Sequence, residues 1–572
     1  MQYKKDSDTY TKNLKIIPYG GVDEIGMNCT SIEYDNEIIL IDAGLGFPEN
    51  NGLGIDYLMP NINYLEKNKE KVKAIFITHG HLDHIGALDT ILPKLKFPQI
   101  FASPFAAELI KHKLIESKII DKVDVTVYRE QDKYDIGKFS VSFFRVNHST
   151  PDAFGLFINT PVGNLIHTGD FKIDNSPEGE RPINLQRISK LSSRGVLALM
   201  SDSTNSFRKG FSKSESQVTE VLRDVVEKAD GRVIVATFSQ LVVRINQLLE
   251  LAKQQGRKVA IAGRSLETTI NIAKNLGYIK VPDNLIVPIH KIENFEKKKQ
   301  MIFTTGHQGE TMAALARIAR DEHKNVKITE GDTVILSSSV IPGNDLVVQK
   351  MIDELAQKGA KVFHQGIMDL HTGGHGYQED QKLMINLVRP RFFIPVHGFQ
   401  SFLAEHGRTA ESVGIPKTNV LIPKDGEEIL LDRKSIKRGA KYRSEPILVM
   451  REKGGEIEPQ IIQERVQLAE AGFITITLGL DQKIKNLATQ PVIFSKGFSV
   501  GKNTRNFIIS LKEHIEQIST GILNSEQDKD KIGVLFEEQI NKFIKKSIGI
   551  DPLILIFLNF KPQTHEDKNN QA

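Results

Sequence analysis

The sequence predicts an α/β protein of several domains, and three observations support this prediction. Its 572 residues exceed what one hydrophobic core usually organises, so about three or four domains are expected. Hydrophobic residues make up 40% and charged residues 26% of the chain, as in ordinary globular proteins. Short β-rich runs alternate with helical stretches, which is the pattern of layered α/β domains.

The first domain is expected over residues 13–207. Its runs EIILIDAG, VKAIFIT, KFSVSFFRV, GLFIN and NLIHTGD are bounded by Gly, Pro, Asn and Asp, so they predict strands with helices between some of them. The same texture returns at 371–445, where RFFIPVHG predicts one more strand. We expect packed sheets with a late return segment.

A second domain is expected over residues 208–370. Here RVIVATF precedes LVVRINQLLELAKQQ, KVAIAG precedes LETTINIAKNLG, and DTVILSSS precedes DLVVQKMIDELAQKG. Strand followed by helix, repeated, predicts βαβ units with a parallel sheet.

Residues 446–562 are expected to form a linker and a small α+β domain. FEEQINKFIKKSIG predicts a helix, and PLILIFLNF predicts a buried strand because it is far shorter than the ~20 residues of a spanning helix. The polar ends, 1–12 and 563–572, are expected to be frayed. The start of the chain has no apolar stretch typical of a secretory signal, so we expect a cytoplasmic protein without membrane contact.

Charge and cysteine content restrict the chemistry. The formal net charge of +4 permits a polyanionic partner without arguing for one. Cys29 is the only cysteine, which excludes an intramolecular disulfide and a thiolate zinc site. Any metal must therefore be held by histidine and carboxylate.

Such ligands occur in the segment AIFITHGHLDHIGA, which begins like a buried strand. It carries His79, His81, Asp83 and His84 at i, i+2, i+4 and i+5. At a strand end, i and i+2 point to the same side, and a turn permitted by glycine can bring the next pair back. A lone histidine would be an ordinary loop residue, but this spacing predicts a loop that serves two metals.

Three further strands end in residues of the same kind. SFFRVNHSTPD reaches His148, NLIHTGDF reaches Asp170 and RFFIPVHG reaches His397. Taken singly, each could be an ordinary polar loop residue. Their recurrence after hydrophobic runs favours one shared metal centre.

These residues resemble the metallo-β-lactamase fold, whose ordered motifs match Asp42 in LIDAG, HGHLDH, His148, Asp170 and His397. LMSDSTNS with Asp202, TTGHQGETMAALARIAR, LSSSVIPGND, HTGGHGYQED and FFIPVHGF extend the resemblance to the ribonuclease J family of the β-CASP nucleases. It runs from about residue 14 to 445 and weakly beyond.

The resemblance implies an αββα sandwich with an inserted β-CASP domain, a small α+β C-terminal domain, and RNA in the cleft between the first two. It implies that His79, His81 and His148 hold one metal, that Asp83, His84 and His397 hold the other, and that Asp170 bridges them. Asp42 and Asp202 would support the site. Two divalent ions per subunit are expected, with zinc favoured and manganese or magnesium as alternatives.

The implied activity is that of a ribonuclease J-type hydrolase, with 5′-3′ exonuclease and endonuclease action in rRNA and mRNA maturation and decay. A water activated by two metals would attack the phosphodiester. Asp83 would receive its proton, and His375 would bond the scissile phosphate or protonate the leaving oxygen.

The resemblance also implies a grip on the RNA 5′ end, with monophosphate favoured, in which glycines let backbone N–H groups reach phosphate. The expected substrate residues are His371, Thr372, Gly373, Gly374, His375, Gln240, Leu241 and Arg244. The chain departs from the family pattern at Gly373 and His307, where serine is usual, and at Gln240 and Leu241. Thr372 is a candidate to compensate for the hydroxyl missing at Gly373.

Self-association through the C-terminal domain, as a homodimer or homotetramer or with a paralogous subunit, is implied by resemblance alone. Three alternatives stay open: a weakly active or scaffold subunit of a degradation complex, a DNA-acting nuclease, and a thioester or β-lactam hydrolase of the same fold. The first is disfavoured because such subunits usually lose metal ligands, and the last because the nuclease motifs are present.

Overall fold

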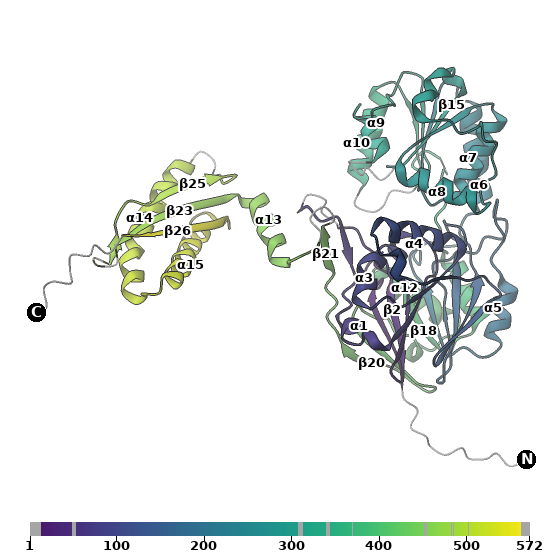
Figure 1. Cartoon of the computed structure of the whole chain (residues 1–572), viewed down its shortest axis with the longest axis horizontal. Helices are drawn as coiled ribbons and strands as arrows, with labels where there is room; N and C mark the ends of the chain where they lie inside the picture. Colours follow the sequence, from purple (N-terminus) through teal and green to yellow (C-terminus); the bar gives the residue numbers. More distant parts are fainter. Residues whose placement is uncertain are drawn as a thin grey trace, which may run out of the picture. The chain divides into compact units, whose positions relative to one another are not determined.

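The computed structural model describes residues 13–48, 53–306, 313–338, 344–368, 370–450, 455–481, 483, 485–500 and 503–561. The predicted tails and His307 lie outside this part of the chain. Two compact units result, Met1–Glu49 with Tyr57–Ile447 and Asn50–Asp56 with Leu448–Ala572. Each unit is described by itself (Figure 1).

Two packed sheets form the base of the first unit. The eight-stranded sheet has the order β20 (Ile436–Lys441), β19 (Glu427–Leu431), β1 (Leu14–Gly20), β2 (Cys29–Tyr34), β3 (Glu37–Ile41), β5 (Val72–Phe76), β6 (Gln99–Ala102) and β7 (Val125–Val127). The six-stranded sheet has the order β18 (Phe392–Val396), β12 (Ala198–Asp202), β11 (Asn164–His167), β10 (Phe154–Asn159), β9 (Phe139–Arg145) and β8 (Lys133–Ile136). Strands β18 to β20 therefore return to sheets that the first part of the chain began.

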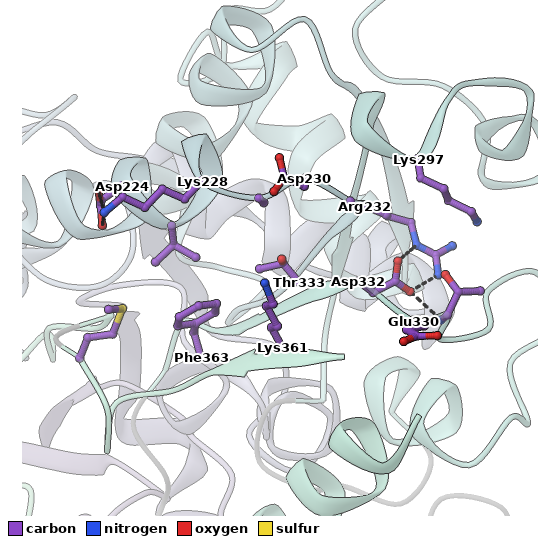
Figure 2. Close-up of a pocket in the computed structure, with 16 residues that line it drawn as sticks. Asp224, Lys228, Asp230, Arg232, Lys297, Glu330, Asp332, Thr333, Lys361 and Phe363 are labelled. Atoms are coloured by element: carbon purple, nitrogen blue, oxygen red, sulfur yellow. Dashed lines mark hydrogen bonds and ion pairs between the residues drawn. The ribbon is translucent and has the colours of Figure 1, made fainter. Parts of the chain in front are cut away.

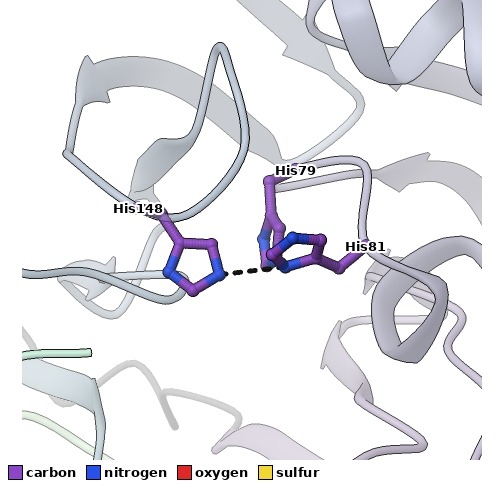
Figure 3. A group of neighbouring side chains, drawn as sticks. All are labelled: His79, His81 and His148. Atoms are coloured by element: carbon purple, nitrogen blue, oxygen red, sulfur yellow. Dashed lines mark hydrogen bonds between the residues drawn. The ribbon is translucent and has the colours of Figure 1, made fainter. Parts of the chain in front are cut away.

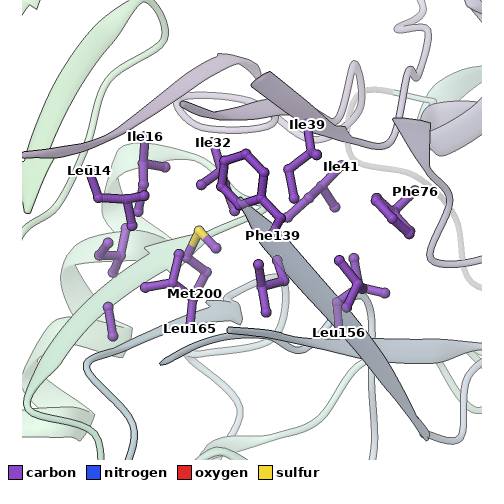
Figure 4. Close-up of a cluster of buried hydrophobic side chains, with 14 of the residues drawn as sticks. Leu14, Ile16, Ile32, Ile39, Ile41, Phe76, Phe139, Leu156, Leu165 and Met200 are labelled. Atoms are coloured by element: carbon purple, nitrogen blue, oxygen red, sulfur yellow. The ribbon is translucent and has the colours of Figure 1, made fainter. Parts of the chain in front are cut away.

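Alternating apolar side chains of both sheets meet in one core, as the period of two in a strand requires. Ile39 and Phe76 of the larger sheet and Leu156 and Met200 of the smaller one belong to this core (Figure 4). The outer face of the six-stranded sheet buries a second cluster under α5 (Leu185–Ser192), α11 (Gln378–Val388) and α12 (Gln400–Ser412). Helix α4 (Pro104–Glu116) packs on β6 and β7 of the other sheet. These layers confirm the predicted αββα sandwich.

A five-stranded parallel sheet is inserted between β12 and β18. Its order is β14 (Lys258–Ala262), β15 (Gln300–Thr304), β13 (Val233–Ala236), β16 (Thr333–Leu336) and β17 (Lys361–Phe363). One apolar cluster packs α6 (Glu215–Glu227), α7 (Val242–Gln254) and α8 (Arg264–Asn275) on one face, and another packs α9 (Ala314–Ala319) and α10 (Asp345–Gln357) on the other (Figure 1). The predicted βαβ texture is confirmed.

The second unit is a small α+β layer. Strand β23 (Phe473–Asp481) pairs antiparallel with β24 (Asn486–Leu487) and β25 (Val492–Lys496) and parallel with β26 (Leu553–Phe560). Helices α14 (Thr504–Ser525) and α15 (Lys529–Ile548) share an apolar core with one face of this sheet. PLILIFLNF does form strand β26, but the prediction that it is buried is wrong for one side, because Leu555 and Phe557 are exposed.

The remaining elements are short or link the larger ones. Apart from short 3-10 helices, they are β4 (Tyr57–Met59), α1 (Asn63–Lys67), α2 (Leu82–Ile85), α3 (Leu88–Lys94), β21 (Ile447–Met450), β22 (Gly455–Ile457) and α13 (Pro459–Ala471). Among the described residues, no helix is long and apolar enough to cross a membrane.

Candidate metal centre

Asp42 anchors the histidine-rich loop to the sheet. It directly follows β3, which pairs in parallel with β5, so it lies beside Thr78 at the start of the loop. Its carboxylate accepts hydrogen bonds from the Thr78 backbone N–H at 2.7 Å and hydroxyl at 2.8 Å. Its Oδ2 also lies 2.7 Å from Nδ1 of His84. This contact turns Nε2 of His84 toward the other candidate ligands.

Three histidines form the first candidate ligand group. Nδ1 of His81 lies 3.1 Å from Nε2 of His79 and 3.0 Å from Nε2 of His148 (Figure 3). Tetrahedral zinc with Zn–N distances of 2.0–2.1 Å would separate its nitrogen ligands by roughly 3.3 Å. The three nitrogens therefore converge at the spacing that one metal ion requires.

The protonation of these histidines suits metal binding. Nδ1 of His148 faces the Gly374 carbonyl oxygen at 2.8 Å, and since that oxygen can only accept, Nδ1 donates and Nε2 keeps its lone pair. Burial holds the pKa of His79 and His148 well below the usual value and lowers the pKa of His81 to about 4. Neutral imidazole is the form that ligates metal.

Asp83, His84, Asp170 and His397 form the second group, with one possible ligand atom from each lying within 4.8 Å of the others. Asp170 Oδ2 lies 3.2 Å from His84 Nε2, and its Oδ1 lies 3.0 Å from His397 Nδ1. Asp83 Oδ2 lies 3.5 Å from Nε2 of both histidines.

Asp170 lies between the two groups. Its Oδ2 is 3.7 Å from Nε2 of His79 and equally 3.7 Å from Nε2 of His148, both members of the first group. The same oxygen contacts His84 of the second group. This one carboxylate is therefore placed to touch ions in both positions.

The second group requires positive charge. Burial raises the pKa of Asp83 and of Asp170, but the neighbouring histidines outweigh it and hold both well below the usual range. Burial lowers the pKa of His397, yet the Asp170 carboxylate raises it to about 10. Burial lowers the pKa of His84 as well, but the Asp170, Asp83 and Asp42 carboxylates outweigh it and hold the pKa well above the usual value. These directions favour cationic histidines beside the carboxylates, and a divalent cation would balance the same negative charge. The residues fit a divalent metal.

Asp202 and His375 extend the cluster on one side. His375 Nδ1 lies 2.8 Å from Asp202 Oδ2, and the His375 ring lies 4.9 Å from that of His148 and 5.4 Å from that of His397. Burial lowers the pKa of His375, but Asp202 outweighs it and raises the pKa above the usual value. A cationic imidazole with one nitrogen held by a carboxylate can donate a proton from the other.

The glycine-rich segment 371–376 packs against the histidines. A Cβ on Gly374 would lie 2.3 Å from Nδ1 of His148, so this position requires glycine. Thr372 is buried and donates its hydroxyl to the Lys213 carbonyl oxygen at 2.9 Å. The hydroxyl thus has a protein partner in this structure, and the expectation that it compensates for a donor missing at Gly373 stays a prediction. His371 is also buried.

Gln240 of the inserted domain contacts the histidine loop directly. Gln240 Nε2 donates to the Gly80 carbonyl oxygen at 2.8 Å, whereas Leu241 is buried at the start of α7. The structure thus brings the first of these predicted residues to the site and keeps the second in the core.

Arg244 is fully buried. Its guanidinium donates to Glu215 Oε2 at 2.6 Å, to the Leu370 carbonyl oxygen at 2.9 Å and to the Ser337 hydroxyl. In this structure it supports the segment 371–376 from behind, and its predicted role as a direct substrate contact stays a prediction.

Sequence reasoning did not single out two supporting residues. Asn28 brings its side-chain amide within 3.1 Å of His84 Nε2 and donates to the Asp83 carbonyl oxygen. Asn205 donates to the His375 carbonyl oxygen at 3.1 Å. Asn28 lies outside the quoted motifs, whereas Asn205 lies within LMSDSTNS. Neither role could be read from the sequence, because each residue acts on another that is distant in the chain.

A pocket of about 590 Å³ lies elsewhere, at the amino edge of the parallel sheet (Figure 2). Arg232, Asp332 and Lys361 line it at the starts of β13, β16 and β17, and Arg232 is already paired with Asp332. Parallel α/β sheets bind ligands at their carboxyl edge. We therefore assign the chemistry to the histidine and aspartate cluster rather than to this pocket.

The two-sheet sandwich and the ligands at its strand ends define a metal-dependent hydrolase of the metallo-β-lactamase fold. Models of three families match: the metallo-beta-lactamase superfamily over residues 23–197, the ribonuclease J beta-CASP domain over 230–355 and the ribonuclease J C-terminal domain over 460–559. The chain belongs to the ribonuclease J family.

Relatives over nearly the whole length support this membership. Ribonuclease J of Synechocystis is 37% identical, with 96% of this chain and 87% of that protein covered. Ribonuclease J2 of Bacillus subtilis is 35% identical, covering 95% and 98%, and ribonuclease J of Mycoplasma pneumoniae is 34% identical, covering 96% and 97%. A solved protein of unknown function from Enterococcus faecalis shares the fold, with a TM-score of 0.51, 16% identity, and 73% of this chain and 100% of that chain covered.

Proposed function

We propose that this protein is a metal-dependent ribonuclease that hydrolyses RNA phosphodiester bonds from the 5′ end and internally, in rRNA and mRNA maturation and decay. One observation carries the proposal. In a chain of the ribonuclease J family, the first and second candidate ligand groups meet at Asp170.

We further propose two divalent ions per subunit, with zinc favoured because imidazole predominates among the ligands. His79, His81 and His148 would hold one ion, Asp83, His84 and His397 the other, and Asp170 would contact both. When bound, the ions supply a nucleophile at neutral pH and neutralise charge on the phosphate.

The side chains complete the reaction. Asp83 is proposed to accept the proton of the attacking water, because its side chain is 26% exposed while that of Asp170 is 4% exposed. His375, held by Asp202, is proposed to bond the scissile phosphate or protonate the leaving oxygen. Its position beside the histidine groups and its raised pKa support this role.

Recognition of the RNA end is assigned to the segment 371–376 with Gln240. Backbone N–H groups at Gly373 and Gly374 would donate hydrogen bonds to a 5′-monophosphate. The serine that is usual at position 373 in the family would also fit here, because a Cβ on Gly373 would lie 3.6 Å from its nearest neighbour, Asn205 Nδ2. Arg244 and Leu241 would support the segment 371–376 from within the inserted domain.

The proposed organisation has a metallo-β-lactamase domain over 13–207 and 371–445, a β-CASP domain over 208–370 and a linker with a C-terminal domain over 446–562. The return of β18 to β20 to the first two sheets supports these limits. We also propose a cytoplasmic enzyme that self-associates through its C-terminal domain.

The decisive experiment compares matched RNA and DNA strands, each with a 5′-monophosphate, for the metal-loaded protein and His81→Ala. We expect cleavage of RNA and no hydrolysis by His81→Ala, because that variant loses a ligand of the first ion. Metal content is measured in parallel. A near wild-type rate in His81→Ala would contradict the site, and preference for DNA would contradict the substrate.

A second comparison tests end recognition. RNA with a 5′-triphosphate should be trimmed more slowly than the same RNA with a 5′-monophosphate, because the segment 371–376 would have to hold two further phosphates. Equal rates would show that the segment 371–376 does not distinguish a 5′-monophosphate from a 5′-triphosphate.

A further inference from the structure

A loop beyond β12 leads from the metal centre to the surface. Within it, the Thr204 hydroxyl lies 3.3 Å from His397 Nδ1, and Asn205 donates to the His375 carbonyl oxygen at 3.1 Å. The next residues, 207–211, read Phe-Arg-Lys-Gly-Phe and are all exposed. This exposed stretch therefore starts two residues from direct contacts with the candidate site.

Aromatic rings gather where this loop meets α12. The ring centroid of Phe402 lies 5.4 Å from that of Phe207 and 5.4 Å from that of Phe399, both in edge-to-face geometry. Phe207 is 52% exposed and Phe399, two residues after His397, is 42% exposed. The half-exposed rings of Phe207 and Phe399 therefore both pack against Phe402, close to the candidate metal ligand His397.

The backbone of the loop is held in place. The Gln378 and Glu379 backbone N–H groups, at the start of α11, donate to the Arg208 and Gly210 carbonyl oxygens at 2.9 and 3.1 Å. The Ser206 hydroxyl donates to the Phe402 carbonyl oxygen at 2.7 Å. Because the backbone is fixed, the exposed side chains need little further ordering to bind a partner.

Cations accompany the rings. Arg208 donates to the Tyr377 hydroxyl at 2.9 Å, and its guanidinium lies 5.4 Å from the centroid of the Tyr377 ring. Lys209 is exposed beside it. Aromatic faces for bases together with cations for phosphates are the combination that binds single-stranded nucleic acid without sequence preference.

We propose that Phe207, Arg208, Lys209 and Phe399 form a platform for single-stranded RNA next to the metal centre. Bases stack on Phe207 and Phe399, while Arg208 and Lys209 face the backbone phosphates. This inference rests on the proposed ribonuclease function. RNA is favoured over a second copy of the chain because the platform adjoins the catalytic cluster and carries a lysine, a residue depleted from protein interfaces.

The first test is kinetic. Phe207→Ala with Phe399→Ala should raise KM for a single-stranded RNA at least about tenfold, because stacking of a base on each ring is lost, with a smaller change in kcat and unchanged metal content. Ile115→Ala, which removes a 60% exposed side chain from α4, is the matched control. Replacement of both phenylalanines by tyrosine should restore KM.

The second test reports stacking directly. The chain contains no tryptophan, so Phe399→Trp introduces a single tryptophan, whose selectively excited fluorescence RNA should quench, whereas Ile115→Trp should respond little. RNA with an abasic site at the stacked position should lose affinity for the wild type but not for the double alanine variant.

The outcomes separate the two hypotheses. An unchanged KM in the double variant of an active enzyme, or no quenching of Phe399→Trp, overturns the platform. Dissociation of an oligomer by the double variant with KM unchanged would assign the surface to a second copy and also overturn it. Failure of the wild type to cleave any RNA refutes the proposed function itself.

Discussion

Nδ1 of His84 lies 2.7 Å from Oδ2 of Asp42, and both side chains are almost completely buried. A carboxylate behind a histidine fixes the tautomer and orientation of the ring, and its loss typically lowers metal affinity by about 10- to 100-fold. We predict this loss for Asp42→Ala, measured by competition with a chelator. Asp121→Ala, at an exposed position, should leave the affinity unchanged. Equal affinities in both variants would contradict the orienting role.

His375 is expected to act on the leaving group. Loss of a general acid typically lowers the rate by about 10²- to 10⁴-fold, so His375→Ala should lower kcat on RNA by this amount. A nucleoside p-nitrophenyl phosphate diester needs no protonation of its leaving group and should be affected much less. His112→Ala, a half-exposed histidine on α4, serves as the control. A similar loss on both substrates would instead indicate phosphate binding or misplacement of neighbouring ligands.

Arg244 and Glu215 form a buried ion pair at 2.6 Å. Removing one partner leaves an uncompensated charge, which costs about 3–5 kcal/mol in typical cases. Lys172, 3.9 Å from Glu215, should offset part of this, so Arg244→Ala is expected to lower stability by about 3 kcal/mol. Thermal unfolding should show the loss, and exposed Arg223→Ala should not. An unchanged melting temperature with a raised KM would instead support direct substrate contact.

Glu180 is expected to make stability depend on pH. Burial raises its pKa to about 7, although Asn147 donates a hydrogen bond to it at 2.9 Å. In the unfolded chain the Glu180 carboxyl has its ordinary pKa of 4.5, so between pH 4.5 and 7 the unfolded state loses this proton more readily than the folded state. The free energy of unfolding of the wild type should therefore fall as pH rises through this range, by about 3 kcal/mol at most.

Glu180→Gln has no titrating group at this position, so it should not show the part of the pH-dependent loss of stability that Glu180 causes. The measurement is the difference in melting temperature between the two proteins across this range of pH. A difference that stays constant with pH would show that the Glu180 pKa is close to its ordinary value.

The layers of the fold and the candidate ligands could be predicted because their signals are local. Hydrophobic runs ending in His148, Asp170 and His397 mark strands β9, β11 and β18, whose ends meet at one edge. Burial of β26 was less predictable, because Leu555 and Phe557 lie on the side of their sheet that α14 and α15 leave uncovered.

The support of the site was not predictable from local pattern. Arg244 belongs to a helix with ordinary amphipathic spacing, and only folding brings Leu370 and Glu215 to its guanidinium. Likewise, only the folded structure shows that the Thr372 hydroxyl donates a hydrogen bond to the Lys213 carbonyl oxygen.

By itself, the sequence determined the chemistry available: seven histidine and aspartate residues that are candidate ligands near strand ends, and a single cysteine. The tertiary structure decided how they are shared, with Asp170 between two groups and Asp42 behind His84. It also decided that Phe207 and Phe399, nearly two hundred residues apart in sequence, share one exposed ring cluster. The physical reason is that ligand identity is set residue by residue, whereas burial, pairing and convergence depend on distances that only the folded chain defines.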